Sequence, residues 1–170
     1  MIFSLKTRQY LLYIFLSCLV LVLTPWWYVK TNEEYVLYRR ADNYYASRDF
    51  EKAARFYGLA RQKGLADPEL LNRLGDSYLA IQDFASALEV FRNLRSIKPE
   101  DLSVLVKLAH VYSLNGMNGK ALDIIGQALE KRPDWRTARI WKARILAQNG
   151  QFSEAIKLYY QILGEYNEKS

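Results

Sequence analysis

Two hydrophobic patterns follow one another along this chain. Positions 10–29 form an uninterrupted run, rich in apolar and aromatic residues, that contains no charge. From about position 34 onward, apolar residues instead recur every three or four positions, which is the spacing of one buried face of an α-helix. This second pattern also repeats itself along the chain at a constant interval. Two successive units place Leu71, Leu74, Gly75, Tyr78, Ala87, Phe91, Leu94 and Pro99, and then Leu105, Leu108, Ala109, Tyr112, Ala121, Ile125, Ala128 and Pro133.

The repeating pattern predicts four pairs of helices, in units of about 34–67, 68–101, 102–135 and 136–169. The first helices are expected near 33–47, 68–81, 102–115 and 136–148, and the second helices near 50–63, 84–97, 118–131 and 152–164. Aspartates suited to helix N-caps stand at positions 49, 67 and 83. Gly116 and Gly150 follow first helices, where a left-handed residue is needed. Thr31 with Glu34 predicts a capping box that opens the first helix.

The 34-residue period, with small, aromatic and proline residues at fixed places, resembles the tetratricopeptide repeat (TPR) family. The resemblance covers about 135 residues and implies an all-α solenoid of four stacked helix pairs with a long concave surface. The small residues that should let the paired helices approach are Ala41, Gly75, Ala109 and Ala143 on the first helices, and Ala53, Ala87, Ala121 and Ala155 on the second. The terminal units are atypical, because Arg40 and Lys142 stand where the middle units have leucine.

The uncharged run at 10–29 predicts a single transmembrane helix, preceded by a short basic tail at 1–9. Twenty helical residues reach about 30 Å, the thickness of the bilayer core. Aromatic residues stand at both ends of the run, as at membrane interfaces. The alternatives are a cleaved signal peptide, a lipoprotein site at Cys18 and a buried core helix. The length of the run favours an uncleaved anchor, followed by the TPR domain at 31–170.

The orientation of this anchor depends on the basic residues that flank it. Lys6 and Arg8 favour a cytoplasmic N-terminus, whereas Lys30, Arg39 and Arg40 oppose it. A short basic tail usually stays inside, so we expect a single-pass protein of a bacterial inner membrane with a periplasmic TPR domain. The alternative orientation places that domain in the cytoplasm.

Composition argues against several classes of function. The net charge is +6, but residues 31–170 carry 21 basic and 18 acidic groups, which is too balanced for a nucleic-acid-binding surface. The single cysteine and the single histidine, His110, make a metal site improbable. His110 has no nucleophile or second base in register, and no glycine-rich phosphate loop is present. We therefore expect no catalytic residues, no cofactor and no enzymatic activity.

The resemblance implies that a partner lies along the inner face made by the first helices. On this sequence, that face holds Tyr35, Tyr38, Asp42, Tyr45, Asn72, Asp76, Leu79, Val106, His110, Ser113, Ile140, Arg144 and Ala147. The first unit is rich in tyrosine, a residue type that suits binding surfaces. We therefore expect a partner to touch that end, with the alternative that Tyr35 and Tyr38 rest on lipid headgroups.

One TPR subclass binds the terminal carboxylate of chaperone tails through lysine, asparagine, asparagine, lysine and arginine at set positions. In the first three units this chain has Tyr38, Asp42, Arg73, Ser103 and Lys107 there, and in the last three Asn72, Asp76, Lys107, Thr137 and Trp141. The aspartates would repel a carboxylate, so this role is not expected.

The last unit offers a second candidate surface. Leu88, Leu122 and Leu129 should each pack on the following unit, but no unit follows the fourth. The residues expected to be left uncovered are Ile156, Tyr160, Leu163 and Tyr166. An uncovered apolar patch suggests docking of a partner or a second copy of the chain, unless residues 164–170 fold back over it.

These expectations combine into a non-enzymatic, membrane-tethered adaptor or assembly scaffold that binds a protein of an envelope complex. By resemblance to small bacterial membrane TPR proteins, that complex would serve exopolysaccharide export, secretion or pilus assembly, or cytochrome c maturation. The alternative is a stable accessory subunit of a multi-span membrane synthase or transporter.

Overall fold

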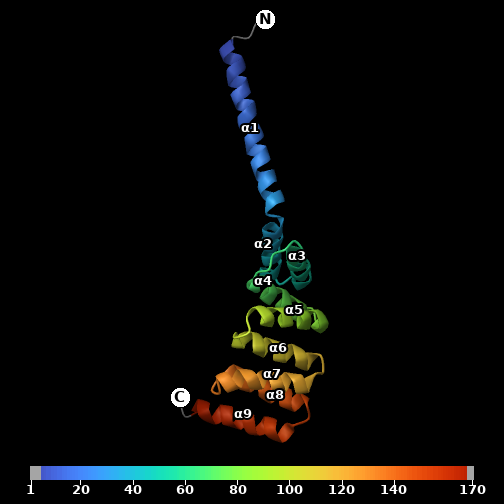
Figure 1. Cartoon of the computed structure of the whole chain (residues 1–170). Coiled ribbons are helices and arrows are strands. Elements are labelled where there is room, and N and C mark those ends of the chain that lie inside the picture. Colours follow the sequence, from blue (N-terminus) through green and yellow to red (C-terminus); the bar gives the residue numbers. More distant parts are fainter. Residues whose placement is uncertain (1–4, 168–170) are drawn as a thin grey trace.

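The computed structural model describes residues 5–167 of the chain. These residues form nine α-helices and no strand, and the helices follow one another in a stack that descends from the N-terminal rod (Figure 1). The helices are α1 (Leu5–Thr31), α2 (Glu33–Ala46), α3 (Phe50–Gln62), α4 (Pro68–Ala80), α5 (Phe84–Ile97), α6 (Leu102–Leu114), α7 (Asn118–Lys131), α8 (Arg136–Gln148) and α9 (Phe152–Asn167).

Helices α2–α9 form four antiparallel pairs, and each helix packs on the next one along the chain. The first helices of neighbouring pairs also touch, α2 with α4 and α6 with α8. The predicted bounds agree with the observed ones to within one residue, except that α9 continues to Asn167. Residues 164–167 continue this helix and do not turn back over the last unit, and the rest of the segment expected to do so, residues 168–170, lies outside the described residues.

Aspartate caps and left-handed residues set the helix ends as predicted. Asp67 accepts hydrogen bonds from the backbone N–H groups of Glu69 (2.6 Å) and Leu70 (3.2 Å), and Asp49 and Asp83 cap α3 and α5 in the same way. The turn between the two helices of a unit requires a positive φ at one position. This position recurs once in every unit, and it is occupied by Arg48 (61°), Gln82 (62°), Gly116 (73°) and Gly150 (79°).

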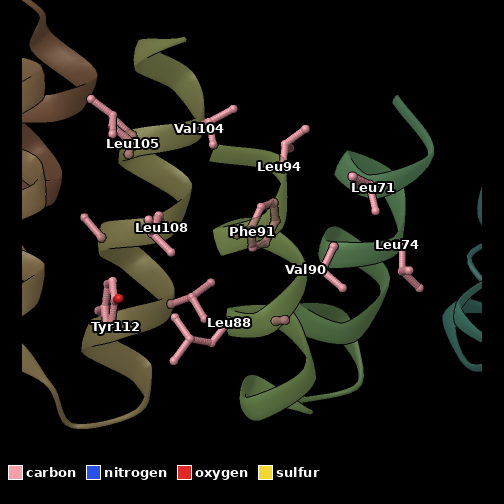
Figure 2. Close-up of a cluster of buried hydrophobic side chains, with 14 of the residues drawn as sticks. Leu71, Leu74, Leu88, Val90, Phe91, Leu94, Val104, Leu105, Leu108 and Tyr112 are labelled. Atoms are coloured by element: carbon pink, nitrogen blue, oxygen red, sulfur yellow. The ribbon is translucent and has the colours of Figure 1, made fainter. Parts of the chain in front are cut away.

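Buried side chains from consecutive helices form one continuous core. Figure 2 shows apolar side chains of α4, α5 and α6 gathered between these helices. Helices α4 and α5 approach each other closely at Gly75, where an added Cβ would lie 2.6 Å from the ring of Phe91. The alanines at the equivalent positions, 41, 109 and 143, are completely buried. These small residues therefore let the paired helices pack closely against each other.

Helix α1 differs from all the others because it packs on no helix pair. It extends from the stack as a single rod, and its described apolar side chains are exposed, Leu21 to 71%. Within the part of the chain that the structure describes, no helix has both the length and the apolarity needed to cross a bilayer. The predicted anchor at 10–29 includes Trp26 and Val29, whose side chains lie outside the described residues. The anchor therefore stays a prediction.

The predicted capping box at the start of α2 is wrong. Helix α1 continues to Thr31, and its hydroxyl donates back to the Trp27 carbonyl (2.9 Å) within the same helix. Asn32 is the N-cap residue of α2, and its side chain donates to the Tyr28 carbonyl (2.9 Å) rather than capping α2. A threonine that is itself helical uses its hydroxyl on its own preceding turn, so it cannot open the next helix.

Candidate protein-binding groove

The first helices α4, α6 and α8 line a cavity of about 340 Å³ that spans the second, third and fourth units. Its lining comes from three consecutive units: Asp76, Leu79, Ser103, Val106, Lys107, His110, Trp135, Thr137 and Trp141. We call this cavity the distal pocket. Positions one repeat period apart occupy equivalent places on these helices, so the repeat brings Ser103 beside Thr137 and Lys107 beside Trp141.

An aromatic pair forms one wall of the distal pocket. The rings of His110 and Trp141 lie 3.9 Å apart at an angle of 34°, so α6 and α8 are held together through them. The guanidinium carbon of Arg144 lies 5.0 Å from the centre of the Trp141 ring, a cation–π arrangement. Burial first, and then the nearby charge of Arg144, lowers the pKa of His110 from its usual value. His110 is therefore neutral at physiological pH and adds no charge to the pocket.

The proximal edge of the distal pocket is closed by a charge pair between units. The Lys107 ammonium donates to both carboxylate oxygens of Asp76 (2.8 and 2.7 Å) and to the side-chain oxygen of Asn72 (2.7 Å). Lys107 and Asp76 are each about a third exposed. The carboxylate of Asp76 is thus neutralised inside the protein, and it presents little net charge to a partner.

The tyrosine-rich end of the inner face is occupied by contacts within the protein. Asp42 accepts from the Tyr57 hydroxyl (2.5 Å) and from Arg73 (2.7 Å), and Arg73 also donates to Glu69 (2.9 Å). Burial, together with the hydrogen bond to Asp42, strongly raises the pKa of Tyr57. These four side chains join the first unit to the second.

Two predicted binding tyrosines pack on this network. The rings of Tyr38 and Tyr45 lie 5.8 and 6.3 Å from that of Tyr57, and Tyr45 also meets Phe50 edge-on at 5.5 Å. Burial raises the pKa of both hydroxyls. Tyr35, by contrast, is 52% exposed. Of the three predicted tyrosines, only Tyr35 stands clear on the surface.

The structure thus divides the residues predicted for the inner face. Asp76, Leu79, Val106 and His110 line the distal pocket, and Arg144 contacts its Trp141 wall. The side-chain oxygen of Asn72 accepts a hydrogen bond from Lys107, and Ile140 is partly buried. Ser113 is buried, and its hydroxyl contacts the side chains of Asn118 (2.9 Å) and Gln148 below the pocket.

Sequence reasoning missed the residues that give the pocket its aromatic character. The sequence pattern predicts Lys107, Thr137 and Trp141 only as positions of a carboxylate clamp, and it assigns no role to Trp135. The available signal was the pair of tryptophans at 135 and 141, at the junction of the last two units. Tryptophan is enriched at the centres of interfaces, so the pair marked this region more specifically than the tyrosines did.

The last unit has an exposed apolar face. Ile156 and Leu163 are each 54% exposed, whereas Leu88, the counterpart of Ile156 in the second unit, is 7% exposed. Phe152 and Tyr160 on the same helix are also exposed. The side chain of Tyr166 lies outside the described residues. The expected exposure is therefore present for three of the four predicted residues.

The described residues hold no cluster of three or more histidine, cysteine, aspartate or glutamate side chains that could ligate a metal ion. The groups that line the distal pocket are suited to packing and hydrogen bonding rather than to proton transfer. His110 is neutral and stacked on a tryptophan, and the Asp76 carboxylate is held by Lys107.

Comparison with known proteins agrees with this geometry. Two models of the tetratricopeptide repeat match the chain, one over residues 38–101 and the other over 78–145. No curated protein matches at a significant level. Among solved structures, MamA 41-end from Desulfovibrio magneticus RS-1 is 15% identical with a TM-score of 0.74, covering 83% of this chain and 80% of that one. The thermophilic TPR protein TTC0263 of Thermus thermophilus is 21% identical with a TM-score of 0.61, covering 77% and 73%. At these identities the likeness establishes the fold alone.

Proposed function

Because this chain belongs to the tetratricopeptide repeat family, we propose that it is a non-enzymatic scaffold that binds a protein partner across α4, α6 and α8. The observation that carries the proposal is the distal pocket, a hollow lined by apolar and aromatic side chains from three units. Stacked repeats of this kind present extended concave surfaces to other proteins.

A photo-crosslinking amino acid tests this proposal directly. It would replace Thr137, an exposed residue that lines the pocket, and separately Asp123, an exposed residue of α7 outside the pocket. A discrete protein adduct in cells from position 137 but not from 123 is the expected result. Equal adducts from both positions, or none from 137, would place the binding surface elsewhere.

The finer proposal is that residues 10–29 anchor this scaffold in a bacterial inner membrane, with the repeats on the periplasmic side. The support is the uncharged sequence and the exposure of its apolar side chains along α1, which no helix pair covers. The full chain should stay with membranes after a carbonate wash, and a reporter fused after Ser170 should be active in the periplasm. Release of the chain by carbonate would show that residues 10–29 are not a membrane anchor, and reporter activity in the cytoplasm would show the opposite orientation.

The partner would belong to an envelope complex, and exopolysaccharide export, secretion or pilus assembly and cytochrome c maturation are the processes to test first. A second candidate function is a stable accessory subunit of a multi-span synthase or transporter, which the exposed apolar face of α9 favours. Purification in mild detergent separates the two. A stoichiometric membrane protein, lost on Ile156→Lys and Leu163→Lys but retained when the distal pocket is altered, supports the subunit.

A further inference from the structure

The first helices of the units change their net charge from one end of the stack to the other. The first helices of the proximal units are slightly acidic: α2 has three acids and two bases, and α4 has two acids and one base. The first helices of the distal units, by contrast, contain no acid. Helix α6 has Lys107 alone, and α8 has Arg136, Arg139, Lys142 and Arg144 without any acid. The distal pocket, which is lined by α4, α6 and α8, spans this change.

The uncompensated charge beside the distal pocket is positive. Lys107 and Asp76 neutralise each other, and His110 is uncharged. Arg144 is exposed and rests on the Trp141 ring, and no described carboxylate lies within ion-pairing distance of it. An exposed arginine that lies over an aromatic ring can still donate two hydrogen bonds from its guanidinium group to a carboxylate.

The pocket itself is suited to a bulky apolar side chain. Leu79, Val106, Trp135 and Trp141 supply apolar surface, and the volume of about 340 Å³ lies at the small end of the range for ligand-binding cavities. The pocket therefore favours an apolar side chain, and Arg144 favours a carboxylate. One short protein segment can carry both groups.

We propose that the distal pocket binds a partner protein segment that inserts one bulky apolar side chain into the hollow lined by α4, α6 and α8 and pairs a nearby carboxylate with Arg144. This proposal rests on the proposed function and names the chemistry of its partner. Burial of the apolar side chain supplies affinity, and the charge of Arg144 selects an acidic over a basic segment.

The test is selection of random 12-residue displayed peptides against the full chain in detergent. The enriched peptides should carry a Trp, Phe or Leu with Asp or Glu within about four positions. Arg144→Glu should weaken a selected peptide about tenfold, as expected when a pairing charge is reversed at the edge of an interface. Arg55→Glu, which reverses an exposed arginine on α3 outside the pocket, is the matched control and should change affinity less than twofold.

The outcomes separate this proposal from the proposed function. Enriched peptides that crosslink at position 137 but are basic or uncharged would overturn the acidic chemistry and leave the groove in place. If peptides crosslink only outside the pocket, both proposals fail. Binding of anionic phosphatidylglycerol vesicles through Arg144, without any peptide enrichment, would replace the segment by a lipid surface. Concentration-dependent self-association abolished by Arg144→Glu would replace it by a second copy of the chain.

A second variant guards against an effect on folding. Val106→Trp would fill the pocket from within and should abolish peptide binding. Circular dichroism must show unchanged helicity for each variant that is compared. Tight binding by a correctly folded Val106→Trp chain would overturn the proposal, because the apolar side chain would then have no place to insert.

Discussion

The two halves of the helix stack use their inner-face aromatic and charged residues in different ways. In the proximal half, Tyr38 and Tyr45 pack on the Asp42–Tyr57–Arg73 network that joins the first two units. In the distal half, Trp141 forms one wall of an open pocket and carries an arginine with no ion-pair partner among the described residues. An abundance of aromatic residues therefore does not by itself mark a binding surface. What matters is whether their polar neighbours are already paired inside the protein.

The comparison assumes that both halves share the same close helix packing, and the largest substitutions test that. Gly75→Leu should destabilise the chain by about 3 kcal/mol or more, because the new side chain would meet the Phe91 ring at once. Ala121→Leu, at a completely buried position of the third unit, should have a similar effect. Urea unfolding followed by circular dichroism measures both.

Gly126→Ala is the matched control for these overpacking variants. Position 126 lies inside α7, where an added Cβ meets nothing within 4 Å. Alanine should therefore stabilise the helix by up to about 1 kcal/mol. If Gly75→Leu unfolded at the urea concentration of the parent chain, the helix contact at position 75 would be misassigned.

If the proximal network contributes stability and the distal pocket contributes binding, two single substitutions should have opposite effects on these two properties. Asp42→Ala should destabilise the protein by about 2 kcal/mol, because it leaves the Tyr57 hydroxyl without its acceptor and removes one of the two carboxylates that Arg73 binds. Arg144→Ala should change stability by less than about 0.5 kcal/mol, since the residue is exposed. Arg144→Ala should also lose partner binding. Asp42→Ala should keep partner binding when it is measured at a temperature at which this variant is folded. The reverse result would move the binding surface to the tyrosine-rich end.

The turns inside the units give a smaller contrast between the halves. Gly116→Ala should destabilise by about 1 kcal/mol, because alanine is strained at a φ of 73°. Gln82→Gly, at the equivalent turn of the second unit, relieves backbone strain in the folded chain but gives the unfolded chain more conformational freedom. These effects oppose each other, so the free energy of unfolding should change by no more than about 0.5 kcal/mol. Thermal melts of the two variants check this, and equal destabilisation would show that these turns are not equivalent.

The smallest expected effect is a pH dependence confined to the distal half. Burial and the Arg144 charge lower the pKa of His110 in the folded chain, so the unfolded chain binds the proton more readily. Stability should be complete above the ordinary histidine pKa of about 6.5 and should fall as the pH drops below it. Melting temperatures at pH 7.5 and 5.5 measure this change. His110→Gln should reduce it, and because this is the chain's only histidine an undiminished change would exclude the assignment.

Particular elements show how far the sequence could be read. The helix bounds, the aspartate caps and the left-handed glycines could be predicted because each depends on residues a few positions apart. The end of α1 was missed, because Thr31 and Glu34 satisfy a local capping rule while the preceding helix already includes Thr31. The candidate site was only partly found. Which of the exposed polar residues pair with one another depends on contacts between neighbouring units, such as Arg73 with Asp42 and Lys107 with Asp76.

The sequence by itself determined the architecture, because a regular repeat with small residues in register dictates helix pairs that can bury their apolar faces only by stacking. It also predicted the exposure of Ile156, since its counterpart Leu88 in the second unit is 7% exposed. Only the tertiary structure decided which inner-face residues remain available. The repeat places equivalent positions side by side, but their side chains differ from unit to unit. The local combination of charge and ring therefore decides between a closed network at Asp42 and an open pocket at Trp141.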